Sequence, residues 1–133
     1  MKGNFTMLRL KLAAIIGALV IGLMSAVPTF AGTSSVTDLR LAPGASICLT
    51  PQTAISYADV QGTANGGGVN VAVYNGAVNA TNTVFLALNS NGFHATFTPS
   101  FPQGAVFPGK FKVCASNPSA TTNTRITMSL TTN

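Results

Sequence analysis

From residue 35 onward the chain alternates apolar and polar side chains in short runs that are separated by turn residues. Apolar residues at every second position are typical of a strand with one buried face. Gly, Pro or Asn-Gly recurs roughly every ten residues, which leaves no window for a stable helix. The predicted strands cover residues 35–41, 45–50, 55–60, 69–74, 83–89, 93–98, 110–115 and 124–131.

Two Asn-Gly pairs, at positions 75–76 and 91–92, stand beside predicted strands. Asn-Gly readily supplies the positive φ angles that a two-residue type I′ turn needs. The second pair predicts a hairpin between residues 83–89 and 93–98. The three glycines at 66–68 lack the Lys-Ser/Thr pair and the following helix of a phosphate-binding loop, and they predict a flexible hairpin connection instead.

Short strands at this spacing predict an all-β domain, an antiparallel two-sheet sandwich of about seven strands. The spacing is immunoglobulin-like in pattern only, because the chain has no tryptophan to pack on a buried disulfide. In addition, Phe111 stands three residues before Cys114, whereas a spacing of two would place both side chains on one face. A small closed β-barrel or a jelly roll is the alternative architecture.

The two cysteines, Cys48 and Cys114, fall in an early and a late predicted strand. In a chain that has left the reducing cytosol, pairing is the expected state, so we predict one disulfide that joins the two sheets. A zinc site is a poor alternative, because His94 is the only histidine and cannot complete a ligand set. A nucleophilic cysteine would need the same imidazole as its base.

The first residues follow the order of a secretory signal. Three cations within the first dozen residues precede an apolar run at 12–27, and the small residues Thr29 and Ala31 follow it. This layout predicts cleavage after Ala31, so that residues 1–31 are a signal peptide and residues 32–133 are one secreted domain. An uncleaved membrane anchor is the alternative, but the apolar run is shorter than the roughly 20 residues that span a bilayer.

The formal net charge of +5 would favour an anionic partner, but three of the seven Lys and Arg residues lie in the predicted signal. The other four, Arg40, Lys110, Lys112 and Arg125, are scattered and outnumber the two aspartates by only two. Scattered cations do not form the basic stripe that follows a nucleic-acid backbone, so we expect no nucleic-acid partner. No second hydrophobic segment approaches spanning length, so we expect no membrane span after signal removal.

Few side chains of the predicted domain can perform acid, base or metal chemistry. It contains Asp38, Asp59, His94 and no glutamate. Asp38 is expected on a solvent face far from Asp59, which does not fit a paired-carboxylate hydrolase, and two isolated aspartates do not supply a calcium site. No Gly-x-Ser-x-Gly motif is present. We therefore predict no enzyme, catalytic residue, metal or cofactor, and an exposed strand position for His94.

Five phenylalanines crowd into residues 93–111, and most of them should belong to the core. Phe101 and Phe107 stand beside prolines in the turn-rich segment 99–109, where burial is harder to guarantee. They predict an apolar contact with a partner.

The predicted function is that of a non-enzymatic extracellular structural or adhesive module, such as a subunit of a fibre or coat. Its partner would be a protein or a cell surface, including copies of itself joined through an edge strand, for which residues 32–43 and 124–131 are the candidates. The alternative is a secreted binding domain for a small molecule, a glycan or a protein such as a protease. The glycan version is weakened by the absence of Trp and by the presence of only Tyr57 and Tyr74 in the domain.

Overall fold

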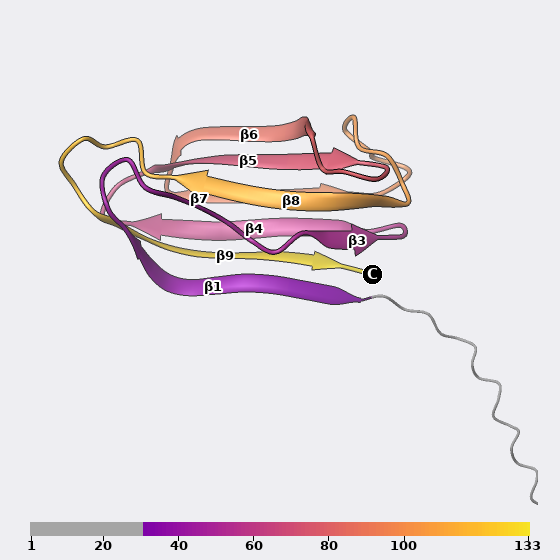
Figure 1. The fold of residues 1–133 in the computed structure, drawn as a ribbon, viewed down its shortest axis with the longest axis horizontal. Helices are drawn as coiled ribbons and strands as arrows, with labels where there is room; N and C mark the ends of the chain where they lie inside the picture. Colours follow the sequence, from indigo (N-terminus) through magenta and orange to yellow (C-terminus); the bar gives the residue numbers. More distant parts are fainter. Residues whose placement is uncertain (1–30) are drawn as a thin grey trace, which may run out of the picture.

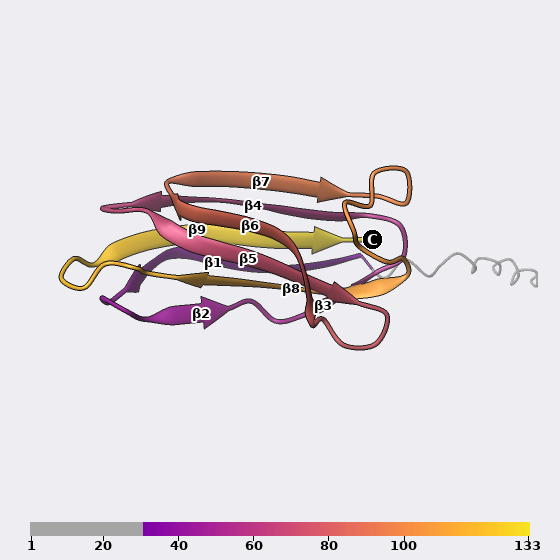
Figure 2. The same cartoon turned by 90° about the horizontal axis from the view of Figure 1, so that it is seen from above.

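A computed structural model describes residues 31–133. Residues 1–30, which belong to the predicted signal peptide, lie outside the described residues. Nine antiparallel strands form two facing sheets, with the core between them (Figures 1 and 2). The strands are β1 (Gly32–Leu41), β2 (Ser46–Cys48), β3 (Gln52–Ala54), β4 (Ala58–Asn65), β5 (Val69–Gly76), β6 (Asn82–Ser90), β7 (Gly92–Phe97), β8 (Gly109–Ser116) and β9 (Thr124–Thr132). Within this part of the chain no helix is long and apolar enough to cross a membrane.

The predicted two-sheet sandwich is confirmed, and its strand order identifies the topology. One sheet has the order β1-β9-β4-β7, and the other has the order β2-β8-β5-β6 with β3 also paired to β8. Apart from β2 and β3, which share a sheet, β5 and β6 are the only consecutive strands that stay in one sheet. This crossing between sheets is the order of a jelly roll, the alternative architecture, and not that of an immunoglobulin sandwich.

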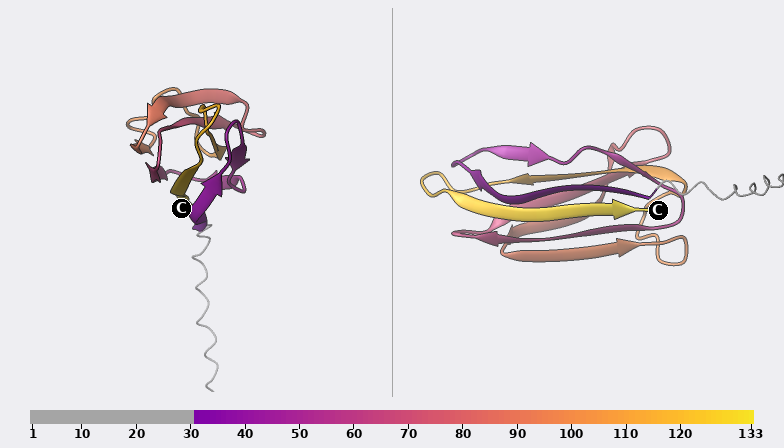
Figure 3. Two further views of the ribbon diagram at one scale, coloured as in Figure 1. Left: turned by 90° about the vertical axis from the view of Figure 1, so that its left-hand side faces the viewer. Right: turned by 90° about the horizontal axis from the view of Figure 1, so that it is seen from below.

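The alternating apolar side chains form the core between the two sheets, which are seen end-on in the left view of Figure 3. In β8 every second residue is buried, as the run 110–115 predicts. The same holds for the apolar residues of β5, β7 and β9, which include Val71, Phe97 and Met128. The rings of Phe97 and Phe111 meet across the core with centroids 5.4 Å apart. β6 also alternates, with Phe85 and Ala87 toward the core, but its outward residues are apolar: Leu86 and Leu88 are 58% and 65% exposed.

The predicted hairpin between residues 83–89 and 93–98 is wrong. β6 pairs with β5 in one sheet, whereas β7 pairs with β4 in the other. A type I′ turn needs positive φ at both central residues, and neither Asn91 nor Gly92 adopts it. Instead, Asn89 takes the positive φ, at 50°, and the chain then passes to the opposite sheet. At Asn75 the chain is still in β5, and residues 77–81 make the connection to β6.

The three glycines at 66–68 also join different sheets, because β4 and β5 lie on opposite sides of the core. The predicted hairpin connection is therefore wrong at this place as well. A Cβ on Gly68 would lie 2.5 Å from the carbonyl carbon of Asn89, so the close approach of these two chain segments requires a glycine.

Cys48 and Cys114 form the predicted disulfide, but it does not join the two sheets. Cys48 of β2 stands directly opposite Cys114 of β8, so the bridge links neighbouring strands of one sheet. Because Ile47 and Leu49 turn toward the core, Cys48 faces outward. The bridge thus secures the short edge strand β2, and the predicted inter-sheet position is wrong.

The two candidate segments for edge pairing differ in the fold. β9, which contains residues 124–131, is hydrogen-bonded to β1 on one side and to β4 on the other, so it has no free edge. β1, within residues 32–43, is an edge strand of the four-stranded sheet. The other sheet ends at β6, the strand that exposes Leu86 and Leu88.

Candidate functional site

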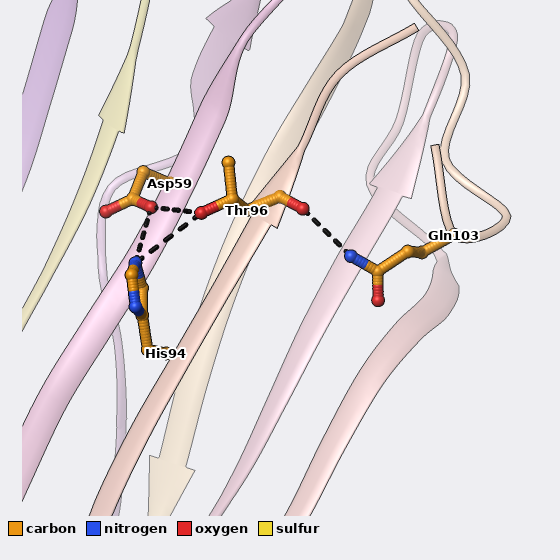
Figure 4. Close-up of polar contacts among 4 residues, drawn as sticks. All are labelled: Asp59, His94, Thr96 and Gln103. Atoms are coloured by element: carbon orange, nitrogen blue, oxygen red, sulfur yellow. Dashed lines mark hydrogen bonds and ion pairs between the residues drawn. The ribbon is translucent and has the colours of Figure 1, made fainter. Parts of the chain in front are cut away.

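Asp59 and His94 lie side by side on the outer face of β4 and β7 (Figure 4). His94 Nε2 is 2.8 Å from Asp59 Oδ1, and Thr96 Oγ1 donates a hydrogen bond to the same oxygen at 2.7 Å. The side chain of Asp59 is 11% exposed, whereas that of His94 is 62% exposed. A nearly buried carboxylate therefore orients an imidazole that faces solvent, as the alternation of β7 predicts for His94.

This cluster is not arranged as a nucleophile, a histidine and an aspartate in series. In such a series the hydroxyl and the carboxylate occupy different ring nitrogens. Here Asp59 and Thr96 both approach His94 Nε2, Thr96 at 3.5 Å, and the hydroxyl of Thr96 donates to Asp59 instead. In the neutral tautomer that carries its proton on Nε2, toward the carboxylate, Nδ1 is an acceptor.

The remaining candidate groups for acid, base or metal chemistry do not converge. Asp38 is 68% exposed and lies 3.3 Å from Arg125 Nη1, on β1 and away from Asp59. Within residues 31–133 no three His, Cys, Asp or Glu side chains gather in a group that could hold a metal ion.

The loop between β7 and β8 is held in one conformation by its own hydrogen bonds. Thr98 and Phe101 bond each other's backbone twice, at 3.0 and 3.2 Å, and Phe101 N also donates to Thr98 Oγ1. Gln103 Nε2 donates to Thr96 O at 2.8 Å, which ties the loop to β7 (Figure 4). Gln103 has φ of 50°, a backbone conformation that side chains other than glycine seldom adopt. The loop is therefore built to a fixed shape.

The fold separates the two phenylalanines that the sequence singles out. The ring of Phe107 is half-buried and packs on Phe111 with a centroid distance of 5.5 Å. Phe101, in contrast, is 75% exposed. Of the pair, only Phe101 leaves a large apolar surface exposed to solvent.

Phe101 borders a surface depression of about 370 Å³, which we call the Phe101 hollow. Its lining consists of Phe85, His94, Ala95, Thr96, Thr98, Phe101 and Gln103. The hollow therefore brings the exposed loop together with His94 and Thr96, the two β7 residues that contact Asp59. The sequence carries no signal for this meeting, because nothing in it shows that β4 pairs with β7 or that Gln103 reaches back to Thr96.

Comparisons with known proteins assign no role to this site. No family model and no curated protein matches the chain. Among solved structures, the chain is similar to one in the infectious bursal disease virus Gx strain, with a TM-score of 0.46, 13% identity, and coverage of 77% of this chain and 32% of that one. It is also similar to a chain of the VP2 subviral particle of that virus, with a TM-score of 0.43, 13% identity, and coverage of 85% and 36%. The chain spans about a third of the length of these viral chains, and at these scores the likeness carries no conclusion.

Proposed function

We propose that this protein is a non-enzymatic extracellular module, structural or adhesive, that acts through surface contacts with a protein or a cell surface. The observation that carries the proposal is the 75% exposed ring of Phe101 in a hydrogen-bonded loop. Burial of an apolar ring is favourable, and an exposed ring contributes no such stabilisation to the fold. Contact with another molecule would bury the ring of Phe101 and so contribute to binding.

Export from the cytosol belongs to the same proposal. The disulfide between Cys48 and Cys114 supports it, because such bonds persist in oxidising compartments. β1 begins at Gly32, so cleavage after Ala31 would remove the signal peptide and leave every strand intact. The mature protein would then remain at the cell surface or in a periplasm, or be released into the medium.

The outer face of the five-stranded sheet supports the version in which copies assemble into a fibre or coat. Leu86 and Leu88 are exposed there, on the edge strand β6. An edge strand with apolar side chains is suited to pairing with a second chain. Size-exclusion chromatography of the exported protein distinguishes this version from a monomeric adhesive module.

A second candidate function, a secreted binding domain for a small molecule, glycan or protein, is favoured by the Phe101 hollow. Ligand sites combine apolar walls with a few fixed polar groups. Phe85 and Phe101 supply the apolar part, and His94 and Gln103 supply polar groups. In this version the hollow itself is the binding site.

Exchange of each phenylalanine for serine tests the main proposal. Phe101→Ser should change the free energy of unfolding by less than about 0.5 kcal/mol, because the ring is exposed, and should abolish attachment to cells of the native source. Phe107→Ser is the matched control, which should lose about 2 kcal/mol with its packing on Phe111 and retain attachment. Urea unfolding and retention on washed cells measure both. Attachment of Phe101→Ser at the wild-type level would refute the proposal.

A further inference from the structure

The polar atoms that remain free around the Phe101 hollow include both donors and acceptors. His94 uses Nε2 on Asp59, and its Nδ1 has no hydrogen-bond partner among residues 31–133. Gln103 donates Nε2 to Thr96 O, and its Oε1 is likewise without a partner in that range. Thr98 Oγ1 accepts from Phe101 N, so its own proton is available to a ligand.

The lining of the hollow contains no Lys, Arg, Asp or Glu. The nearest carboxylate, that of Asp59, lies nearly buried behind His94 and is occupied by His94 and Thr96. A charged ligand would lose hydration here without gaining an opposite charge. The lining therefore favours a neutral ligand that both donates and accepts hydrogen bonds.

The apolar part of the hollow is aromatic. Phe101 borders it and is 75% exposed, and Phe85 also lines it. The face of an aromatic ring is electron-rich and attracts polarised C–H bonds. A pyranose ring carries such C–H bonds on its faces and hydroxyl groups around its rim. It matches an aromatic face with donors and acceptors beside it.

The polar groups are also held in place before a ligand arrives. Asp59 fixes the ring of His94, and the bond from Gln103 to Thr96 O fixes its amide. Gln103 holds a positive φ of 50°, and strained backbone conformations concentrate at ligand sites. Groups that are already ordered lose less conformational entropy on binding. Asp59 and Gln103 thus act partly as positioning residues.

We infer that the Phe101 hollow binds a neutral sugar ring, stacked on Phe101 and hydrogen-bonded by His94 Nδ1, Gln103 Oε1 and the Thr98 hydroxyl. The inference rests on the proposed function, because it names the ligand class of the same contact site. At about 370 Å³, the hollow is of the size of small-ligand sites.

The test is a titration of the isotope-labelled mature protein, followed by NMR, with methyl glycosides of glucose, galactose, mannose, xylose, fucose and N-acetylglucosamine. Glucuronate serves as the acidic comparison. The amide signals of Thr96, Phe101 and Gln103 should shift with at least one neutral sugar, and that of Ser119 at the opposite end should not. Absence of a shift with every neutral sugar, or tighter binding of glucuronate, overturns the inference.

Variants separate a sugar site from a nonspecific apolar surface. Phe101→Ala should weaken binding at least tenfold, whereas Phe101→Trp, with its larger ring face, should strengthen it severalfold. Leu88, which is 65% exposed, is an apolar residue outside the lining of the hollow, and Leu88→Ala should leave the sugar affinity unchanged. His94→Ala should weaken binding about fivefold, and His94→Gln, which keeps an acceptor, should restore part of it. Equal affinities of Phe101→Ala and the wild type overturn the inference.

The two proposals can fail separately. If Phe101→Ser abolishes attachment to cells and no neutral sugar shifts the three amides, the contact site stands and the sugar inference is overturned. If a neutral sugar binds and Phe101→Ser still attaches to cells, the sugar site stands and the adhesive function is refuted.

Discussion

The two ends of the sandwich carry loops that are fixed by the same means and expose different side chains. Residues 117–123 connect β8 to β9 at one end, and residues 98–108 connect β7 to β8 at the other (Figure 1). Asn117, which is 2% exposed, donates Nδ2 to Leu41 O and Thr122 O and accepts a bond from Ser119 N. Gln103 plays a similar part at the other end through its bond to Thr96 O.

The two loops differ in the side chains that they expose to solvent. The loop at 117–123 exposes mainly polar or small side chains, such as those of Thr121 and Thr122. The loop at 98–108 exposes Phe101 and Val106, at 75% and 45%. Rigidity by itself therefore does not mark a contact site, since both loops have it. We propose that a rigid loop is a contact site where it holds an aromatic ring in water, because an exposed apolar ring is hydrated unfavourably and adds no stability to the fold.

The largest expected effect comes from removing the disulfide, which lies three residues before Asn117 and secures the polar end. The variant Cys48→Ala/Cys114→Ala should lose about 4 kcal/mol of unfolding free energy, because the bridge spans a sequence separation of 66 and restricts the unfolded chain. The folded fraction should keep the attachment that depends on Phe101. Urea unfolding and cell retention measure the two quantities. A stability loss below about 1 kcal/mol would contradict the chain-entropy explanation.

A smaller effect is expected at the buried amide of the polar end. Asn117→Ala removes three hydrogen bonds and leaves Leu41 O without its partner, so it should cost about 3 kcal/mol. Asn123→Ala, an exposed asparagine of the same loop, is the control and should cost less than about 0.5 kcal/mol. Thermal and urea unfolding distinguish them. Equal stabilities of the two variants would show that Asn117 does not hold this loop.

The smallest effect on stability, accompanied by a loss of contact, is expected at Gln103. Gln103→Gly relieves a positive φ but loses the bond to Thr96 O, so the two changes of about 1 kcal/mol nearly cancel. Attachment through Phe101 should still weaken severalfold, because the loop is no longer tied to β7. Gln103→Ala keeps the strain and loses the bond, and it should be about 1 kcal/mol less stable than Gln103→Gly. Unchanged attachment in both variants would show that loop rigidity is irrelevant to contact.

The candidate site was predictable in its parts and not as a whole. The outward position of His94 follows from alternation with Phe93 and Ala95, and the prolines beside Phe101 point to an exposed loop. The contact between His94 and Asp59 depends on the register of β7 against β4, which short-range patterns do not contain. The sequence disfavours glycan binding because the domain lacks Trp, and only the fold shows that the side chain of Phe101 is exposed.

What the sequence determined by itself is local: strands from their period of two, turns from Gly and Pro, and a disulfide from two cysteines in a chain predicted to be exported. Pairing was decided only by the tertiary structure. It placed β6 and β7 in opposite sheets despite Asn91-Gly92, and it put Cys48 and Cys114 on neighbouring strands of one sheet. The physical reason is that side-chain period depends on adjacent residues, whereas strand partners depend on the combined burial of the whole core. That burial outweighs the preference of any single turn.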